Sequence, residues 1–486
     1  MAGSAAIQTV DYEVLAPLLV LALGALVVLV LDLFGHRRPQ VVGWVAMAVV
    51  VAAGACLPLS AGGQTLCSTS GQCAYAVGQV ASAFQLVVLV SSGVVVLLSV
   101  TTVGELRLPA GEYYFLLLAS VSGAVAVAGT QDLVSLLVVL EVASLPTFAL
   151  VALRHDDPRA AEGALKIFLY SVVSVAVAVY GLALVYGSTG SVRFADVRAA
   201  LADPSSHTPV AAVGIVLVLV VFLFKVAAVP VHTWAPDTYQ SAPVPVAAYL
   251  SVVSKVAGFA GLSLVLLAFA PWQAVWSWPL AAASAATMVV ANVAALRQTR
   301  AVRLLAWSSI AQAGYVLVPF AALVATGQPR IAPLTAVVAY LAVYAAMNLG
   351  AFAVVCAVAR ESPDPRLADF DGLFRRQPWA AVGLAFFLAA LAGLPPGLSG
   401  LFVKVGVLAV PLGTGAWVLA LLMAAATVVG LAYYLAFAAR LFRHGTADRG
   451  GPLSVSRPVA AAVAATFGLT VLLSVAPALA FGLVSS

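Results

Sequence analysis

The sequence has 486 residues and a formal net charge of +5, and 63% of its residues are apolar whereas only 8% are charged. Soluble globular domains have roughly 45 to 50% apolar and about 25% charged residues, so this composition excludes a soluble domain and indicates a chain embedded in a lipid bilayer. The motifs of independent enzymes are also missing: the sequence has no glycine-rich phosphate loop after a strand, no HExxH and no Ser/His/Asp arrangement.

Fourteen runs are long enough to cross a bilayer, which takes about 20 apolar residues. The first run follows Asp11 and Glu13 and precedes His36, Arg37 and Arg38. This charge order is the reverse of a secretory signal, so we expect a retained first span with its N-terminus outside. The predicted spans are residues 15–34, 41–60, 80–103, 112–130, 132–153, 163–187, 209–228, 243–269, 278–296, 301–323, 332–359, 379–410, 415–442 and 458–483. The sequence therefore predicts an all-α, polytopic membrane protein whose two termini both face outside.

The arginine positions support this topology, because cytoplasmic loops are enriched in positive charge. Sixteen arginines fall in predicted cytoplasmic connections and three in outer ones, and one missed span would scramble this alternation. The net positive charge thus reflects topology and does not require nucleic acid. The cytoplasmic arginines are Arg37, Arg38, Arg107, Arg154, Arg159, Arg297, Arg300, Arg303, Arg360, Arg366, Arg375, Arg376, Arg440, Arg443, Arg449 and Arg457, and the outer ones are Arg193, Arg198 and Arg330.

The four cysteines form no pattern typical of a metal site. Cys56 and Cys356 lie in apolar runs, where a free thiol behaves as a small hydrophobic group. Cys67 and Cys73 share a predicted outer loop, which is an oxidising location in bacteria. A disulfide and two free thiols are both compatible with that loop.

Lysine and arginine are separated along the chain. The four lysines, Lys166, Lys225, Lys255 and Lys404, all lie in predicted spans, whereas the nineteen arginines lie in or near loops. Codon usage could favour arginine in the loops, but it does not explain why lysine occurs only in the spans. A buried ammonium group can lose its proton, whereas a guanidinium group does not. The pattern therefore indicates lysines that load and release protons.

Glu141 is a fifth ionisable group inside the predicted membrane region, ten residues into its span and too deep to reach the interface. One charge at the bilayer centre costs about 2.5 to 3.5 kcal/mol, so five would cost on the order of 15 kcal/mol unless they face a polar interior and pair with one another. The alternative is that these residues form structural ion pairs or extend to the interface. For Lys166, three residues into its span, both interpretations remain open.

Two of the lysines lie beside predicted helix breaks. Lys225 precedes four prolines between residues 230 and 245, and Lys404 follows the segment Pro395–Gly400. Proline interrupts a helix, and non-helical backbone at membrane depth is tolerated only where it lines protein or water. Interrupted segments at spans seven and twelve, each with one lysine, are typical of repeat-built transporters whose ion sites lie at discontinuous helices.

The two breaks occupy equivalent positions if spans four to eight and nine to thirteen are repeats. Each repeat then has five spans, and because five is odd the two repeats run inverted across the membrane. The predicted organisation within one transmembrane domain is three N-terminal helices (1–110), a first five-helix repeat (111–270), a second five-helix repeat (271–445) and a C-terminal helix (446–486).

His232 lies in the first break, and its ordinary pKa of about 6.5 suits a proton relay between lysines. A polar residue that only fills the break is the alternative. Asp237 and Thr238 are expected to cap or brace the broken segment and not to carry protons. The other histidines, all in predicted loops, are His36, His155, His207 and His444.

A long stretch of the sequence, from Phe224 to Lys255, reads FKVAAVPVHTWAPDTYQSAPVPVAAYLSVVSK. This segment resembles the seventh and eighth spans of the antiporter-like subunits of complex I and the related multisubunit sodium/proton antiporters. LKIFLYSVVSVAVAVYGLALVYGSTGS from Leu165, RLLAWSSIAQAGYVL from Arg303 and LAGLPPGLSGLFVKVGVL from Leu391 resemble the N type of these subunits. The resemblance covers nearly the whole chain from the third span onward. Lysine in the twelfth span and the lack of a long extension after the fourteenth favour the N type over the M and L types.

The resemblance implies that a glutamate of span five pairs with a lysine of span seven, and that lysines of spans eight and twelve continue a polar axis. These roles fall on Glu141, Lys225, Lys255 and Lys404. At about 4 Å and an effective dielectric near 20, such a pair is worth about 4 kcal/mol. Opening the pair would move a proton from Lys225 toward His232 and Lys255, and Lys404 would pass protons to an exit.

The energy for this transport must come from partners, because one proton moved against 100 mV needs about 2.3 kcal/mol. The resemblance implies that the chain works in the bacterial cell membrane with the other membrane-arm subunits of complex I. NADH, flavin, iron–sulfur clusters and quinone would bind to other subunits, so no cofactor is expected here. Two alternatives remain: a subunit of a cation/proton antiporter without redox partners, and a structural membrane subunit with inert charge pairs.

Overall fold

The structure is a computed structural model, and it describes residues 10–34, 38–68, 71–154, 157–203, 208–322, 332–443 and 452–484. Arg37, Arg330, Arg449 and the histidines other than His232 lie outside these ranges. The described elements are α1 (Tyr12–Leu33), α2 (Pro39–Ala55), α3 (Leu57–Ser60), β1 (Gln64–Cys67), β2 (Cys73–Ala76), α4 (Gln79–Glu105), α5 (Ala110–Val127), α6 (Leu133–Ala152), α7 (Pro158–Thr189), α8 (Phe194–Ala202), α9 (Pro209–Lys225), α10 (Trp234–Ser241), α11 (Val244–Ala268), η2 (Ala270–Trp272), α12 (Gln273–Ala295), α13 (Ala301–Ala321), α14 (Ala332–Ala359), η4 (Leu367–Phe370), α15 (Leu373–Arg376), α16 (Pro378–Ala392), α17 (Leu398–Thr414), α18 (Trp417–Arg440), α19 (Arg457–Val475) and α20 (Ala478–Phe481).

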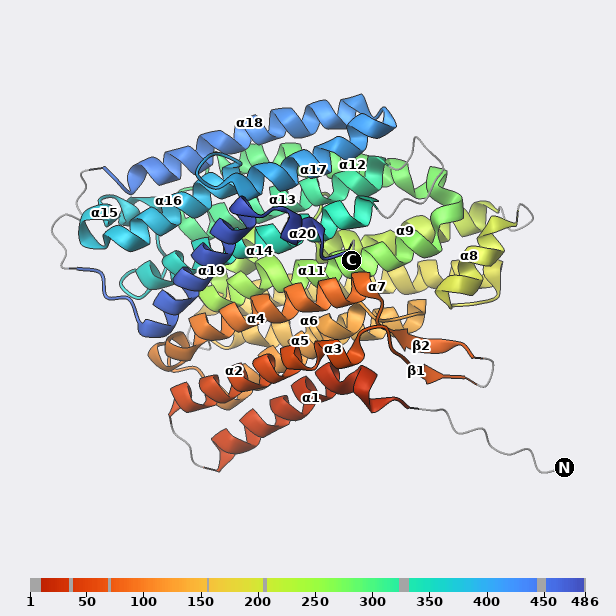
Figure 1. Ribbon diagram of the computed structural model, residues 1–486, viewed down its shortest axis with the longest axis horizontal. Coiled ribbons are helices and arrows are strands. Elements are labelled where there is room, and N and C mark those ends of the chain that lie inside the picture. Colours follow the sequence, from red (N-terminus) through yellow and green to blue (C-terminus); the bar gives the residue numbers. More distant parts are fainter. Residues whose placement is uncertain are drawn as a thin grey trace.

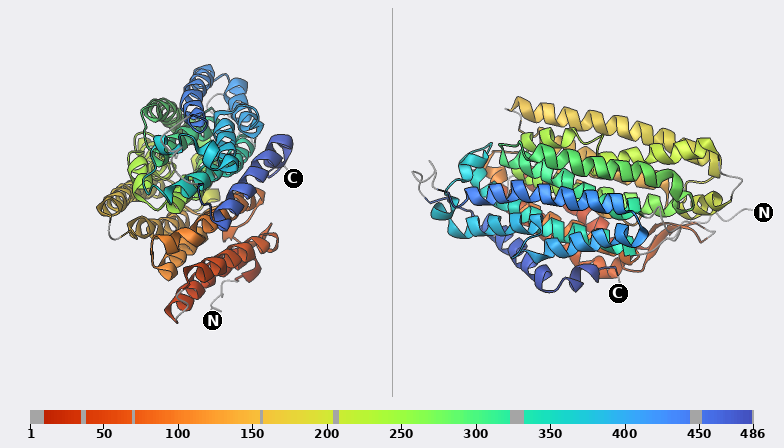
Figure 2. Two further views of the ribbon diagram at one scale, coloured as in Figure 1. Left: turned by 90° about the vertical axis from the view of Figure 1, so that its left-hand side faces the viewer. Right: turned by 90° about the horizontal axis from the view of Figure 1, so that it is seen from above.

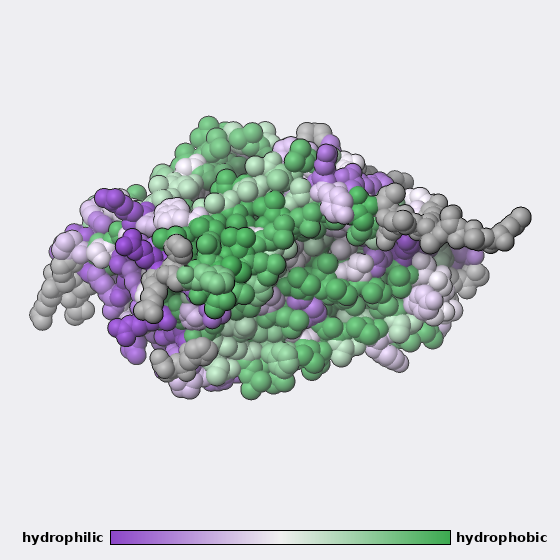
Figure 3. Space-filling model, turned by 90° about the horizontal axis from the view of Figure 1, so that it is seen from below, coloured by the Kyte–Doolittle hydropathy of each residue, from purple (hydrophilic) through white to green (hydrophobic). Residues whose placement is uncertain are grey.

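The long helices lie side by side along the long axis of the molecule, and the connections between them lie at its two ends (Figures 1 and 2). On the face shown in Figure 3, hydrophobic side chains cover the middle, whereas hydrophilic side chains gather at both ends. This is the surface expected of a protein whose middle is surrounded by hydrocarbon.

Twelve helices in the described part are long and apolar enough to cross a membrane, and α9, α16 and α17 are shorter apolar helices. The predicted seventh span, 209–228, contains α9, and α10 lies beyond its predicted end, whereas the predicted twelfth span, 379–410, corresponds to α16 followed by α17. Each of the other twelve predicted spans contains one of the long apolar helices. The prediction of a helical membrane protein with breaks in spans seven and twelve is therefore confirmed.

Both breaks begin with the same kind of helix cap. After α9, Ala227 is left-handed (φ 58°), and the amide of Ala228 donates to the carbonyl of Leu223 at 2.8 Å. After α16, Gly393 is left-handed (φ 86°), and the amide of Leu394 donates to the carbonyl of Ala389 at 2.9 Å. A left-handed residue turns the chain away from the helix axis, so in each span the helix ends inside the bundle.

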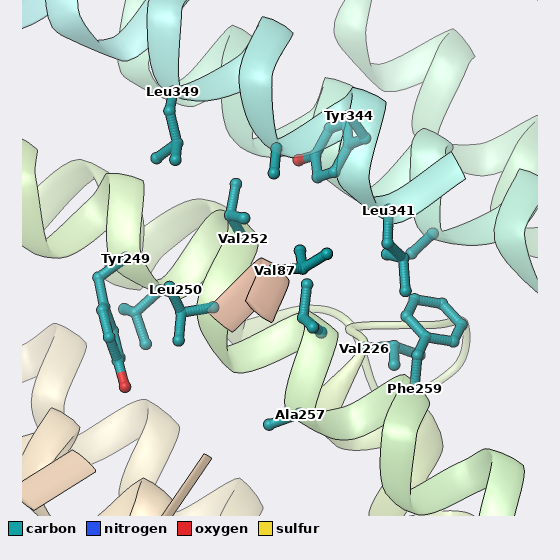
Figure 4. Close-up of a cluster of buried hydrophobic side chains, with 14 of the residues drawn as sticks. Val87, Val226, Tyr249, Leu250, Val252, Ala257, Phe259, Leu341, Tyr344 and Leu349 are labelled. Atoms are coloured by element: carbon teal, nitrogen blue, oxygen red, sulfur yellow. The ribbon is translucent and has the colours of Figure 1, made fainter. Parts of the chain in front are cut away.

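Helices α11, α13 and α14 form the centre of the bundle, and nearly all of their described residues are buried. Figure 4 shows part of this core, in which Leu250 and Val252 of α11 lie near Tyr344 and Leu349 of α14. Val226, the first residue of the break after α9, belongs to the same cluster. The core therefore buries the start of the first break, Val226 to Ala228, and the middle of α11.

The two ends of the molecule are held together differently. At one end, β1 and β2 form an antiparallel hairpin, and Cys67 and Cys73 are joined by a disulfide, one of the two states that the sequence left open. Cys356 is a buried free thiol, and Cys56 is a partly buried one.

At the other end, which we call the arginine-rich end, ion pairs connect the loops; these are Arg360–Glu105 at 2.6 Å, Arg300–Asp364 at 2.6 Å, Arg159–Asp364 at 3.5 Å and Arg440–Asp371 at 3.3 Å.

Candidate functional site

The candidate residues lie on four helices and in the first break. Lys225 is the last residue of α9, His232 lies between α9 and α10, Lys255 is in the middle of α11, Lys404 is in α17 and Glu141 is in α6. Lys225, His232, Lys255 and Lys404 are only 6%, 8%, 2% and 7% exposed. The lysines therefore face protein and not lipid.

Glu141 and Lys225 form the ion pair expected from the resemblance. The Nζ of Lys225 lies 3.7 Å from Oε1 of Glu141, and it also donates a hydrogen bond to the hydroxyl of Ser144. The ring of Phe224 lies 5.2 Å from the same ammonium. A Cβ at Gly258 would lie 2.9 Å from the Cβ of Lys225, so the glycine lets α11 approach the end of α9 closely.

Lys255 is held by a polar cluster within the central helices. Its Nζ donates to the carbonyl of Ser309 in α13 at 2.6 Å. The hydroxyl of Tyr344 donates to the hydroxyl of Ser309 at 2.9 Å, and the amide of Asn348 donates to the hydroxyl of Ser251 at 2.7 Å. These residues were not predicted from the sequence, although uncharged polar residues within apolar runs are a usable signal.

Lys404 binds the end of the broken helix that precedes it. Its Nζ donates to the carbonyls of Leu391 at 2.7 Å and Ala392 at 2.9 Å, the last two residues of α16. Carbonyls in the last turn of a helix lack amide partners and carry partial negative charge, so they attract a cation. The side-chain amide of Gln312 in α13 also donates to the Leu391 carbonyl, at 3.4 Å. Lys404 is thereby connected with α13, whose Ser309 carbonyl accepts the hydrogen bond of Lys255.

His232 lies in the break between α9 and α10, but in the described part of the chain it makes no direct contact that joins the lysines. Its ring centre lies 5.6 Å from that of Trp307, and its buried Nδ1 has no hydrogen-bond partner within the described ranges. No hydrogen bond to Lys225 or Lys255 is found among the described residues. The structure therefore brings Glu141 and Lys225 together, links Lys404 with α13, and leaves His232 in the break without a direct bond to either lysine.

Lys166 differs from the other lysines because it belongs to an ion cluster near the arginine-rich end. Its Nζ lies 2.5 Å from Glu162 and 2.9 Å from Asp237, and Asp237 also binds Arg303 at 2.6 Å. These side chains are about one-third exposed or more. Asp237 thus joins α10 to both α7 and α13, which is the bracing contact expected of it.

Replacement of Asp237 with Asn is expected to lower the temperature of half-inactivation of the purified complex, because it removes the charge shared by Lys166 and Arg303. Two partly exposed pairs are worth about 1 kcal/mol together, and salt screens them, so the difference from wild type should shrink in 1 M salt. Heat inactivation at low and high salt measures this. Glu162→Gln, which removes only one exposed partner of Lys166, is the milder control. Loss of proton uptake without any loss of stability would contradict a bracing role.

Buried lysines on several helices, two discontinuous helices and carbonyls that hold a cation are typical of membrane proteins that translocate ions. Among the described residues, no group of histidine, cysteine, aspartate or glutamate side chains could hold a metal ion.

Comparison with known proteins identifies the family. A family model described as NADH:quinone oxidoreductase/Mrp antiporter, transmembrane, matches residues 130–430. NADH-quinone oxidoreductase subunit N 2 of Streptomyces griseus is 47% identical over 92% of this chain and 85% of its own length. NADH-quinone oxidoreductase subunit N of Salinispora tropica is 42% identical over 90% of this chain and 86% of its own length.

A solved structure extends the match. A chain of respiratory complex I from Thermus thermophilus with bound aureothin superposes with a TM-score of 0.78 and 31% identity, over 96% of this chain and 98% of that chain. The chain belongs to the NADH:quinone oxidoreductase/Mrp antiporter family, and within it to the N subunits of NADH-quinone oxidoreductases.

Proposed function

We propose that this chain is a proton-translocating membrane-arm subunit of a bacterial NADH-quinone oxidoreductase. The observation that carries the proposal is the Glu141–Lys225 ion pair at the end of a discontinuous helix, followed by Lys255 and Lys404 in the interior. The relatives named as subunit N of NADH-quinone oxidoreductase support electron transfer from NADH to quinone as the reaction to which transport is coupled.

Transport would begin at the ion pair. A closed pair favours the ammonium form of Lys225, because the carboxylate of Glu141 neutralises its charge. When the pair opens, the proton leaves Lys225 toward the break with His232 and then toward Lys255. The polar cluster around Ser309 and Gln312 connects Lys255 with the carbonyls that hold Lys404, and Lys404 passes the proton on.

The organisation that we propose around this path has two inverted five-helix repeats, 111–270 and 271–445, flanked by three N-terminal helices (1–110) and a C-terminal helix (446–486). The similar caps after α9 and α16 support the repeats. Both termini would face outside in the bacterial cell membrane, which places the arginine-rich end in the cytoplasm. The partners are the other membrane-arm subunits and the bilayer. NADH, flavin, iron–sulfur clusters and quinone would bind elsewhere in the complex, and this chain would bind no cofactor.

Replacement of Lys225 tests the proposal. In inverted membrane vesicles, Lys225→Met is expected to abolish NADH-driven proton uptake through this subunit, or to stop both uptake and NADH-quinone electron transfer, while the complex remains assembled. Lys225→Arg keeps the positive charge beside Glu141 but does not release a proton, so it should lose transport as well. Normal proton uptake and electron transfer in both variants would refute the role of Lys225 and favour a structural subunit.

A further inference from the structure

The hydrogen bond of Lys225 goes to Ser144 and not to Glu141. The 3.7 Å between Nζ of Lys225 and Oε1 of Glu141 is within the range of an ion pair but exceeds the 2.7 to 3.2 Å of an N–H···O hydrogen bond. Oε1 of Glu141 is buried and has no hydrogen-bond partner among the described residues. In this structure the ammonium of Lys225 therefore donates its hydrogen bond to the hydroxyl of Ser144, whereas in a shorter ion pair it would donate to the carboxylate of Glu141.

Ser144 is positioned for this contact by its own helix. It follows Glu141 by three residues on α6, so the two side chains lie on the same face, and it is only 5% exposed. Its hydroxyl donates to the carbonyl of Leu140, one turn earlier. Because its proton points to Leu140, the oxygen of Ser144 presents a lone pair to Lys225.

Neighbouring helices fix this part of α6. The hydroxyl of Ser120 in α5 donates to the carbonyl of Ala143 at 2.5 Å and lies 2.7 Å from the hydroxyl of Tyr249 in α11. A Cβ at Gly123 would lie 2.8 Å from the Cα of Ala143, so α5 and α6 are in close backbone contact. These contacts hold Ser144 in place while the side chain of Lys225 changes state.

A hydroxyl and a carboxylate can both accept a hydrogen bond from either protonation state of a lysine, but only the hydroxyl can also donate to the neutral amine. The ammonium form only donates hydrogen bonds, and the neutral amine also accepts one; a serine hydroxyl can accept from the first and donate to the second, but a carboxylate only accepts. If the Ser144 proton turns from the Leu140 carbonyl to the amine, Lys225 remains bound after it has lost its proton.

We propose that Ser144 is a positioning residue for Lys225, an alternative partner that holds the lysine side chain when the Glu141–Lys225 pair opens and the proton leaves. This inference rests on the proposed function and adds a third residue, Ser144, to the Glu141–Lys225 pair that opens and closes. Without Ser144, the neutral amine would have no hydroxyl to donate to it and no charge for Glu141 to attract, so release of its proton would weaken the hold on its side chain.

The test compares four variants of the intact complex in inverted vesicles, with NADH-driven proton uptake and NADH-quinone electron transfer measured in the same preparation. Ser144→Ala removes the hydroxyl, and Ser144→Thr keeps it. Ser91→Ala makes the same change at a buried serine of α4 whose hydroxyl has no partner within the described ranges. Lys225→Met reports on the proposed function itself.

We expect the rate of proton uptake in Ser144→Ala to fall about tenfold, which corresponds to the loss of one hydrogen bond to a charged group. Ser144→Thr should recover most of it, and Ser91→Ala should match wild type. Equal rates of proton uptake in Ser144→Ala and Ser91→Ala would overturn the inference, and so would equal losses in Ser144→Ala and Ser144→Thr, which indicate a packing defect. If Lys225→Met pumps normally, the proposed function fails and this inference fails with it; a defective Lys225→Met beside a normal Ser144→Ala rejects the inference alone.

Discussion

Glu141→Gln is expected to abolish proton translocation in an assembled complex. Glu141 supplies the negative charge 3.7 Å from Lys225, and a pair at this distance is worth about 4 kcal/mol at an effective dielectric near 20. The amide of glutamine keeps the shape of the side chain and removes its charge. Lys225 then loses the attraction that reloads it with a proton, and NADH-driven proton uptake into inverted vesicles should disappear.

Two comparisons make this result specific to the pair. Glu162→Gln also removes a carboxylate that binds a lysine, but that pair lies near the arginine-rich end and the Glu162 side chain is 64% exposed, so it should keep nearly normal uptake. The double variant Glu141→Gln/Lys225→Met should be more stable to heat than Glu141→Gln alone, because it no longer buries an uncompensated charge. Normal uptake in Glu141→Gln, or strictly additive stability losses in the double variant, would contradict the assignment.

The spans and breaks could be predicted from the sequence because they depend on local properties. Apolar runs of the right length are visible in any window, and prolines near Lys225 and Lys404 mark the places where a helix cannot continue. The pairing of Glu141 with Lys225 also followed from the family resemblance, and the structure places the two groups within ion-pair distance. Whether Cys67 and Cys73 pair was not decided by sequence.

The partners of the buried lysines could not be predicted, because they depend on how distant segments meet. Lys404 binds main-chain carbonyls of Leu391 and Ala392, which are free only because α16 ends there, and any residue type could have supplied them. The sequence left two interpretations of Lys166 open, because its partner Asp237 is 71 residues away in sequence. Only the structure shows that the two side chains lie 2.9 Å apart. The role of Ser144 was hidden for a similar reason, because serine is common in membrane helices and only the end of α9 gives this one a cation to bind.

Gly400→Ala is expected to disable the second break as severely as a change of Lys404 itself. A Cβ at residue 400 would overlap the carbonyl oxygen of Ala390 and would lie 2.8 Å from its carbonyl carbon. Both atoms are backbone, so α17 would have to move away from the end of α16. Overpacking of this kind costs about 1 to 3 kcal/mol, and the shift would also separate Lys404 from the carbonyls of Leu391 and Ala392.

Gly413 provides the matched control on the same helix, because a Cβ there would meet no atom within 4 Å. Gly413→Ala should keep proton uptake and should even stabilise α17 slightly, since alanine favours helix over glycine by about 1 kcal/mol. Proton uptake, electron transfer and the amount of assembled complex should be measured for both variants and for Lys404→Met. We expect Gly400→Ala and Lys404→Met to lose uptake while Gly413→Ala retains it. Normal uptake in Gly400→Ala would mean that transport tolerates a displaced α17, and the contact between Lys404 and the end of α16 would then have no part in the proton path.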